Sequence, residues 1–350
     1  MEKRKVLICP LNWGLGHASR CVPIIRELHR QGHTIMLASS GSAHTFLRRE
    51  LPEFTLEELP DYHIKYWRSI PIWLSVLFQF PKLYFKIRSE HSAVKKLITK
   101  HSIDTIISDN RLGGYDARIK SIYISHQIQI KDPFGSFQNI ASRLHNRFMQ
   151  KFDQIWIPDL EHPKENLGGA LSHPSIKLEK SKYIGWLSRL EITNPSKESS
   201  NILILLSGIE PFRADLEADL IKQAKLLPSY TFTVIGGQIT PTQEDHHLPS
   251  HMHYIPFGGK HVLEEEIGKA SLIICRPGYS TLMDLALFKK KVLLIPSPGQ
   301  TEQVYLANRL NCFITNQSKL MLSEQIPLAF NYPPLNPQGA VVDFRSIIKL

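Results

Sequence analysis

Short apolar runs alternate with amphipathic segments along most of the chain, and this alternation predicts strands that alternate with helices. The first apolar run, Lys5–Pro10, leads through a glycine-containing turn into residues 21–28, where apolar positions recur at helical spacing. Gly32 suits the left-handed end of that helix, and residues 34–38 form the next apolar run. Strand, helix and strand in this order make a βαβ unit, whose strands are parallel.

The same pattern occurs in two successive series, which predicts two doubly wound domains. Later strands of the first series are expected at residues 104–108, 121–125 and 154–158, and those of the second at 201–206, 231–235, 253–255, 272–275 and 292–295, with a helix from about 211 to 227. Residues 183–200 are mixed polar and contain a proline and several serines, so we place the domain connection there. We therefore expect an α/β fold with Rossmann-like domains at residues 1–182 and 183–340, followed by a C-terminal helix at 341–350.

Size and charge bound the class of protein. The 350 residues are enough for two domains with separate cores. The formal net charge of +10 favours an anionic partner, with a generally basic surface as the alternative. The basic residues are dispersed and form no recognised nucleic-acid module, so nucleotide phosphates or acidic lipid are favoured over nucleic acid.

Cysteine usage and the N-terminal segment indicate a cytoplasmic protein. The four cysteines are scattered without a C-x-x-C pair, and Cys9 and Cys275 fall in expected strands, so we expect buried free thiols. A strand begins within five residues of the N-terminus, so no signal peptide is expected. No apolar run is long enough to span a bilayer.

The segment Arg276-Pro277-Gly278-Tyr279-Ser280-Thr281 is the most informative part of the chain. It joins a buried apolar run to an apolar helical run, so it forms a turn at a helix N-terminus, where backbone N–H groups and the helix dipole favour a phosphate. Asp284, about one turn further on, can accept hydrogen bonds from a vicinal diol. A second polar loop follows and contains Gln300, Glu302 and Gln303. Together these features predict a site for a nucleotide diphosphate-sugar.

Two other positions of the second domain are donor-site candidates with structural alternatives. Ser207 and Gly208 end its first strand, and Gly208 would let the backbone approach an anion; the alternative is an ordinary strand–helix turn. Arg276 could stabilise a departing diphosphate or form a structural ion pair.

Polar residues also follow the strands of the first domain, at the edge where open α/β sheets bind ligands. The first strand leads into Asn12-Trp13-Gly14-Leu15-Gly16-His17, which lacks the third glycine of the dinucleotide fingerprint because residue 19 is serine. Asp109-Asn110-Arg111 and His126 follow two later strands. They are acceptor-side candidates, with helix caps or salt bridges as the alternatives.

These motifs resemble the glycosyltransferase family that includes the peptidoglycan lipid-intermediate N-acetylglucosaminyltransferase, most clearly between Gly278 and Gln303. The resemblance implies a GT-B type fold, in which two Rossmann-like domains face a central cleft and the last helix packs back on the first domain. It implies that Asp284 binds the ribose, that Gln303 contacts the donor sugar, and that the backbone at Phe257 and Gly258 meets the uracil ring. A plain glycine turn is the alternative at Phe257 and Gly258.

The resemblance also makes His17 a candidate general base, because an imidazole can take a hydroxyl proton near neutral pH. A helix cap or an acceptor contact are the alternatives for His17. Two loops depart from the family pattern: the loop at residues 12–17 has fewer glycines, and residues 207–211 lack a Gly-Ser-Gln-Gly type sequence. The assignments that rest on these loops therefore depend on position more than on identity.

The implied reaction is the inverting, metal-independent transfer of a sugar from a UDP-linked donor to an acceptor hydroxyl, on a lipid-linked or cell-envelope glycan. The chain has no Asp-x-Asp, and the histidines near Glu244 and Asp245 match no familiar metal site, so we expect no metal and no cofactor. Two alternatives share the architecture: a nucleotide-sugar 2-epimerase, and a non-catalytic nucleotide-sugar-binding protein.

Residues 70–80 are apolar and aromatic, and basic residues flank them: Lys65, Arg68, Lys82, Lys86 and Arg88. Such a segment can lie on an anionic membrane surface. The alternative is a core helix with a basic outer face. The resemblance to an enzyme with a lipid-linked acceptor favours peripheral contact with the inner face of the cytoplasmic membrane.

Overall fold

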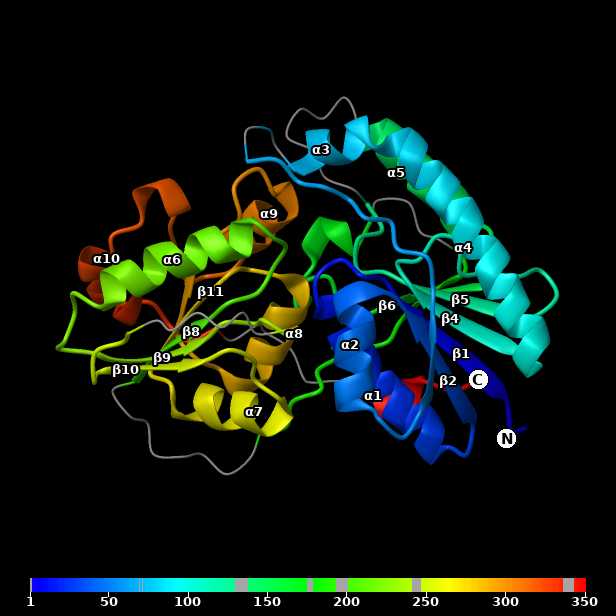
Figure 1. Ribbon diagram of the computed structural model, residues 1–350, viewed down its shortest axis with the longest axis horizontal. Coiled ribbons are helices and arrows are strands. Elements are labelled where there is room, and N and C mark those ends of the chain that lie inside the picture. Colours follow the sequence, from blue (N-terminus) through cyan, green and yellow to red (C-terminus); the bar gives the residue numbers. More distant parts are fainter. Residues whose placement is uncertain are drawn as a thin grey trace. The chain divides into compact units, whose positions relative to one another are not determined.

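The computed structural model describes residues 2–68, 70, 72–129, 138–174, 179–192, 201–240, 247–335 and 343–350. The chain forms two compact units (Figure 1). The first unit comprises Met1–Lys65, Trp73–Ser188 and Gln338–Leu350, and the second comprises Tyr66–Ile72 and Arg189–Pro337. The boundary after Ser188 lies within the segment proposed as the connection, whose residues 193–200 are outside the described part. The sequence pattern did not indicate that Tyr66–Ile72 belongs to the second unit.

The first unit is built on a parallel seven-stranded sheet of order β3-β2-β1-β4-β5-β6-β7. Its strands are β1 (Lys5–Pro10), β2 (Thr34–Ser39), β3 (Thr55–Glu58), β4 (Thr105–Asp109), β5 (Lys120–Ile124), β6 (Gln154–Ile157) and β7 (Ser181–Tyr183). Its helices are α1 (Gly16–Arg30), α2 (Gly41–Glu50), α3 (Ile72–Phe78), α4 (Phe80–His101), α5 (Gln138–Met149) and α11 (Phe344–Ile347), with a 3-10 turn at Gly169–Leu171.

The strand order of this sheet reverses between β1 and β4, and the two strands end level with one another. Pro10 is the register partner of Asp109, so the loops after both strands leave the sheet side by side. Side chains on both faces of β1 are buried, which is why its sequence is continuously apolar rather than alternating. The reversal is the position at which doubly wound sheets bind ligands.

The second unit has a parallel six-stranded sheet of order β10-β9-β8-β11-β12-β13. Its strands are β8 (Asn201–Leu205), β9 (Thr231–Ile235), β10 (Met252–Ile255), β11 (Leu272–Cys275), β12 (Val292–Leu294) and β13 (Phe313–Ile314). Its helices are α6 (Phe212–Ala224), α7 (Lys260–Lys269), α8 (Tyr279–Phe288), α9 (Thr301–Arg309) and α10 (Leu322–Phe330), with a 3-10 turn at Gln317–Lys319.

Helices cover both faces of this second sheet. Ile202 and Ile204 of β8 belong to one buried cluster with apolar residues of α6 and α10, while α7 packs against the same strand and lies on the other side of the sheet in Figure 1. Two parallel sheets, each with helices around it, confirm the predicted α/β class. Cys9 and Cys275 are buried and free, as expected.

The C-terminal residues contribute to the first unit. Lys182 Nζ donates to the carbonyl of Ile347 at 2.7 Å, and Gln31 Nε2 donates to that of Ile348 at 2.9 Å. The helix here, α11, is a single turn that Asp343 caps by accepting from the N–H of Arg345, so it is shorter than the expected helix at residues 341–350. Residues 341 and 342 lie outside the described part.

Candidate active site

His17 and Asp109 form a hydrogen-bonded pair at the edge where β1 and β4 end. Asp109 is the last residue of β4, and His17 is the second residue of α1, so neighbouring strand ends place them together. His17 Nδ1 lies 2.7 Å from Asp109 Oδ1; the carboxylate is fully buried, whereas the His17 side chain is 15% exposed. A buried acceptor therefore orients an imidazole that still reaches the surface of the unit, which is the arrangement a general base requires.

Arg20 completes this pair from one turn further along α1. Its Nε donates to Asp109 Oδ2 at 2.5 Å, and its Nη2 donates to Asp109 Oδ1. Burial would raise the pKa of Asp109, but Arg20 and His17 outweigh that effect and hold it well below its ordinary value. Burial is also the largest influence on the pKa of His17, which it lowers, so the imidazole is neutral near pH 7.

A second set of polar groups lies around the same pair. Arg20 Nη1 lies 2.9 Å from Nδ1 of His126, and Asn110 Nδ2 lies 3.4 Å from Nδ1 of His17. Tyr123 Oη donates to Asn110 Oδ1 at 2.9 Å and lies 3.0 Å from Nε2 of His145. Asn110 has φ of 57°, an uncommon conformation for a residue other than glycine. The structure thus brings His17, Asp109, Asn110 and His126 together as one cluster.

Arg20, Tyr123 and His145 belong to this cluster but were not candidates from the sequence. The only available signal for Arg20 was its spacing of three from His17, which places both on one face of a helix. Nothing local marks Tyr123, which lies inside β5, or His145, which reaches it from α5.

Arg111 is directed into the protein rather than toward a ligand. The side chain is 1% exposed, and its guanidinium donates to the carbonyls of Pro10 and Pro60, to Glu90 Oε1 at 2.6 Å and to Ser40 Oγ at 2.6 Å. These bonds connect the end of β1 and the loops after β2, β3 and β4 to α4. The geometry therefore gives Arg111 a structural role, the salt-bridge alternative.

The loop after β1 is held by hydrogen bonds at Asn12 and is uncrowded at Gly14. Asn12 accepts from Ser42 Oγ and from the N–H of Ala43, and donates to Asp61 Oδ2 at 2.6 Å, so it ties this loop to the start of α2. Gly14 has φ of 71°, and a Cβ added there would meet no atom within 4 Å. Gly16 opens α1 directly before His17. The backbone beside His17 is therefore both left-handed and uncrowded at Gly14.

The donor-site candidates of the second unit follow its strands at one edge of its sheet. Registers of Leu205 with Ile235 and with Cys275 place the ends of β8, β9 and β11 level. The loops that leave this edge carry Ser207 and Gly208 after β8, Phe257 and Gly258 after β10, Gly278 after β11, and Gln300 after β12. The structure thus gathers these positions at the ligand-binding edge of a parallel sheet.

The N-terminus of α8 is the candidate anion-binding element at this edge. Gly278 is its N-cap, and the N–H of Leu282 bonds back to the Gly278 carbonyl, so the helix starts as predicted. Ser280, Thr281 and Asp284 are half-buried and lie on one side of the helix, whereas Leu282 and Met283 between them are buried. A phosphate at the helix start and a diol beside Asp284 would therefore meet the same face.

Gly208 and Gly258 show two different uses of glycine. Gly208 is exposed, has φ of 121° and has no atom within 4 Å of where a Cβ would be, so the β8–α6 turn is open to a ligand. Gly258 is buried, and a Cβ there would come within 3.1 Å of Leu263. A side chain at residue 258 would therefore require Leu263 to shift, while the neighbouring Phe257 is half-buried.

Arg276 and Gln303 hold the loops of this edge from inside. Arg276 is 1% exposed and donates to the carbonyls of Ile295, Pro296 and Phe212 and to Gln317 Oε1 at 2.7 Å. Burial lowers the pKa of Arg276 to about 10. Gln303 is 5% exposed and accepts from the N–H of Ser297 at 2.7 Å, whereas Gln300 and Glu302 are half-buried. Within the described part of the chain Arg276 has no ion-pair partner; it bonds three carbonyl oxygens and one amide oxygen, and with Gln303 it holds these loops in place.

Comparison with known proteins agrees with this geometry. Residues 215–331 match the model of the glycosyltransferase family 28 C-terminal domain. The matched residues lie within the second unit. An uncharacterized glycosyltransferase of Methanosarcina mazei is similar along most of the chain, with 24% identity over 313 residues that cover 85% of this chain and 81% of that protein.

Solved structures place the whole chain in the same class of fold. Spinosyn rhamnosyltransferase SpnG, complexed with thymidine diphosphate, has a TM-score of 0.64 at 13% identity, covering 93% of this chain and 91% of that one. MurG of Acinetobacter baumannii has a TM-score of 0.54 at 14% identity, covering 93% and 90%. The chain is therefore a glycosyltransferase with the GT-B fold, which confirms the family resemblance drawn from the sequence.

The first unit of this glycosyltransferase also exposes an apolar surface. Leu77 and Phe78 at the end of α3 are 46% and 66% exposed, and Phe85 on α4 is 69% exposed. Among described helices, none combines the length and the apolar character needed to cross a bilayer. Arg68, one of the basic residues expected to flank this surface, belongs to the second unit and forms a two-bond salt bridge with Asp215 of that same unit.

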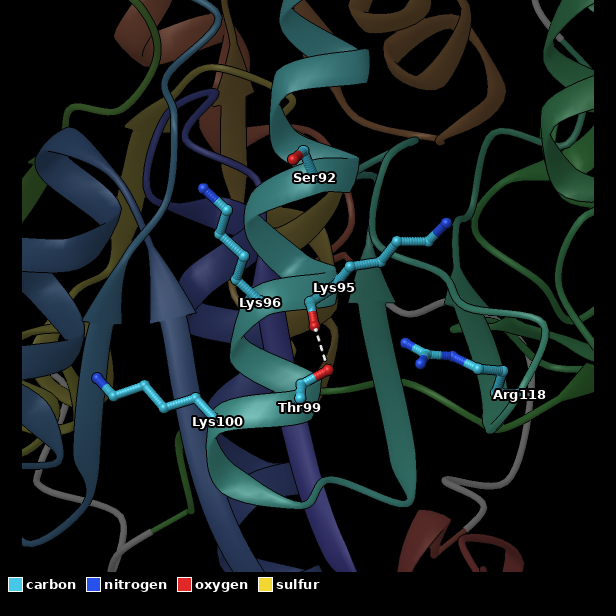
Figure 2. Close-up of a pocket in the computed structure, with 6 residues that line it drawn as sticks. All are labelled: Ser92, Lys95, Lys96, Thr99, Lys100 and Arg118. Carbon is cyan, nitrogen blue, oxygen red and sulfur yellow. Dashed lines mark hydrogen bonds between the residues drawn. The ribbon is translucent and has the colours of Figure 1, made fainter.

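Basic residues continue along the outer face of α4 (Figure 2). Lys95, Lys96 and Lys100 project from the helix, and Arg118 from the loop before β5, around a shallow depression that Ser92 and Thr99 also line. Lys100 pairs with Glu57 and Arg118 with Asp116, so part of this charge is neutralised. The one acidic residue of α4, Glu90, is buried against Arg111.

Proposed function

We propose that this glycosyltransferase moves a sugar from a UDP-linked donor to an acceptor hydroxyl by direct displacement with inversion, and that no metal takes part. The hydrogen-bonded pair of His17 and Asp109 carries this proposal. It joins a partly exposed imidazole to a buried carboxylate at the ligand-binding edge of the first sheet. An acceptor hydroxyl at that edge would find a neutral base already oriented.

In this mechanism Asp109 accepts the Nδ1 hydrogen of His17, which leaves Nε2 with the lone pair. Nε2 takes the acceptor proton as the acceptor oxygen forms its bond to the anomeric carbon. The bond from that carbon to the diphosphate oxygen breaks, and its electron pair leaves with the nucleotide. Backbone N–H groups at the start of α8 would stabilise the charge that develops on the diphosphate.

We assign donor binding to the second unit. Its support is the N-terminus of α8, the open turn at Gly208 and the half-buried Asp284 one turn into the helix. The helix N-terminus suits a phosphate, the open turn lets the backbone come close to a ligand, and Asp284 suits the ribose diol. SpnG, a structural neighbour, is complexed with thymidine diphosphate, which is a nucleotide of the same charge class.

We further propose that the acceptor is lipid-linked and that α3 and the start of α4 rest on an anionic membrane surface. Exposure of Leu77, Phe78 and Phe85 favours this over the core-helix alternative. The basic residues along α4, including the lysines in Figure 2, would add an electrostatic attraction to the anionic surface, and salt would screen this attraction. The expected localisation is the inner face of the cytoplasmic membrane.

A thermal-shift panel of UDP-, GDP-, dTDP- and CMP-sugars, followed by product analysis with membrane lipid extracts, tests the proposed function. Stabilisation by UDP-sugars and a new glycolipid are the expected results. A 2-epimerised nucleotide sugar without an acceptor product would indicate the isomerase alternative. Stabilisation without any turnover would indicate a binding protein instead.

A further inference from the structure

Arg20 places a positive charge between two imidazoles and a carboxylate. The side chain is 1% exposed, and a guanidinium can only donate hydrogen bonds. Its Nη1 lies 2.9 Å from Nδ1 of His126, so that nitrogen must accept and the His126 proton must sit on Nε2. The other two nitrogens, Nε and Nη2, hold both oxygens of Asp109.

His17 Nδ1 has one acceptor and two donors as neighbours, and the more distant donor is Asn110 Nδ2 at 3.4 Å. Asp109 Oδ1, which only accepts, lies at 2.7 Å, and Arg20 Nη2, which only donates, lies at 2.9 Å. A hydrogen on Nδ1 satisfies the carboxylate and leaves Nε2 as the basic nitrogen. The guanidinium beside it opposes the arrival of a second proton on the ring.

We propose that Arg20 is a positioning residue: by holding both Asp109 oxygens and lying against His17 and His126, it fixes the tautomers of both imidazoles and restrains the basicity of His17. This inference rests on the proposed role of His17 as the base. Asp109 alone would orient the ring but would also stabilise its protonated form. With Arg20 present, Asp109 still accepts the hydrogen bond that orients the His17 ring, and the guanidinium offsets much of the negative charge of the carboxylate.

The charged and titratable groups around His17 support this balance. Burial lowers the pKa of His17 most, Asp109 from β4 raises it, and Arg20 from α1 and His126 from the loop after β5 lower it. Asn110, also at the end of β4, and Cys21 of α1, whose thiol lies 3.5 Å from Asp109 Oδ2, complete the surroundings. The net result is a neutral imidazole at the pH where a base is needed.

Titration of ¹⁵N-labelled histidines by NMR in the full-length unliganded protein tests the proposal without any substrate. In wild type we expect His17 to carry its proton on Nδ1 and His126 on Nε2, with His17 identified by the signal that His17→Ala removes. In Arg20→Gln the midpoint of His17 should rise, because a positive charge is lost and Asp109 is released. In Asp109→Asn it should fall, and in the double variant it should return toward wild type.

Arg30→Gln is the matched control, since Arg30 lies on the same helix and its side chain is 71% exposed beside Glu27. It should leave the His17 midpoint unchanged. If Arg20→Gln fails to fold, Arg20→Lys and the double variant decide, and Arg20→Lys should show a smaller rise because lysine cannot reach Asp109 and His126 together. A wild-type His126 protonated on Nδ1, or an unchanged His17 midpoint in the folded variants, overturns the proposal.

The pH profile of UDP release from UDP-N-acetylglucosamine, with membrane lipid extract as acceptor source, supplies the catalytic readout. In Arg20→Gln the ratio of kcat/KM at pH 8 to that at pH 6 should rise severalfold, because a higher His17 pKa moves the acid limb of the profile toward neutral pH. A purely structural arginine would lower both values equally. If the NMR midpoint moves while wild type turns over no nucleotide sugar, the role of Arg20 stands and the proposed function fails.

Discussion

At the ligand-binding edges of the two sheets, buried polar side chains bond to different kinds of partner. In the first unit, buried side chains bond to one another: Arg20 to Asp109, and Asp109 to His17. In the second unit Arg276 and Gln303 bond mainly to backbone groups of the loops instead, and the buried ion pair of Arg213 and Glu217 lies within α6. What faces outward there is a helix N-terminus, open glycine backbone and half-buried short side chains.

This difference matches the two tasks of a glycosyltransferase. Moving a proton requires a side chain whose pKa is set by fixed neighbours, as His17 has. Binding a diphosphate requires backbone N–H groups in the right places, which loops held from inside can supply. We therefore expect changes in the first edge to alter turnover, and changes in the second to alter stability or nucleotide affinity.

The largest effect should come from His17→Ala. Loss of the base should lower turnover by about 10²–10⁴-fold, while the affinity for UDP changes little. Steady-state kinetics and calorimetry measure the two quantities. Since burial lowers the pKa of His17, wild-type activity should stay level on moving from alkaline to neutral pH and fall only below the ordinary histidine range, as the ring becomes protonated.

His29→Ala is the control for this change, because His29 lies in the last turn of the same helix and packs edge-on against Phe54. It should retain wild-type turnover. If His17→Ala stays within a few-fold of wild type, the base role is lost and a structural role remains.

Arg276→Met should act on stability rather than on the donor. Removing the guanidinium leaves the buried carbonyls of Ile295, Pro296 and Phe212 without this donor, which should cost about 3 kcal/mol of unfolding free energy. Chemical denaturation measures the loss, with Lys289→Met at the exposed end of α8 as the comparison. A folded Arg276→Met protein that has lost UDP affinity, at unchanged stability, would instead give Arg276 the diphosphate role.

Asp284→Ala should weaken UDP binding by about 1–3 kcal/mol, because the ribose hydroxyls lose a charged acceptor. Calorimetry with UDP gives the value, and Glu265→Ala on α7, an exposed acidic residue of the same unit, should not change it. Equal UDP affinity in Asp284→Ala and wild type, with the fold intact, would remove Asp284 from the site. The expected effect is smaller than that of His17→Ala because binding is spread over backbone groups.

The sequence predicted the central strands well and missed both edge strands of the first sheet. Residues 272–275 were expected as a strand and form β11, because a strand buried on both faces is continuously apolar. β3 and β7, at the edges of the first sheet, carry few apolar residues and were not predicted. Edge strands lie partly in solvent, so their sequences do not need the apolar run that marks a central strand.

The candidate site shows a similar limit. Position at strand ends was enough to predict that His17, Asp109 and His126 lie at one edge of the sheet, since parallel strands end together. It was not enough to separate them from Arg111 and Arg276, which also follow strands but point inward. Their partners are mostly backbone carbonyl oxygens of residues distant in the chain. Every residue has such an oxygen, so the sequence does not indicate which ones accept these bonds.

The smallest expected effects concern membrane binding. They test which unit lies on the membrane that would carry the acceptor. Wild-type protein should sediment with phosphatidylglycerol vesicles at low salt and be released as salt rises, since each basic residue near the surface contributes only about 1 kcal/mol and is screened. Replacing Leu77, Phe78 and Phe85 by Ser should weaken binding further. Because these side chains are exposed, the melting curve and UDP affinity should stay near wild type.

The exposed apolar residue Leu226, 76% exposed just beyond α6 of the second unit, supplies the matched control. Leu226→Ser should leave vesicle binding unchanged if the first unit alone docks. Equal loss in both variants would mean a general apolar attraction with no orientation. Absence of wild-type sedimentation at low salt would remove the membrane contact, and with it the argument that the acceptor beside His17 is carried on a lipid; the sugar-transfer chemistry of His17 and Asp109 would then need a water-soluble acceptor.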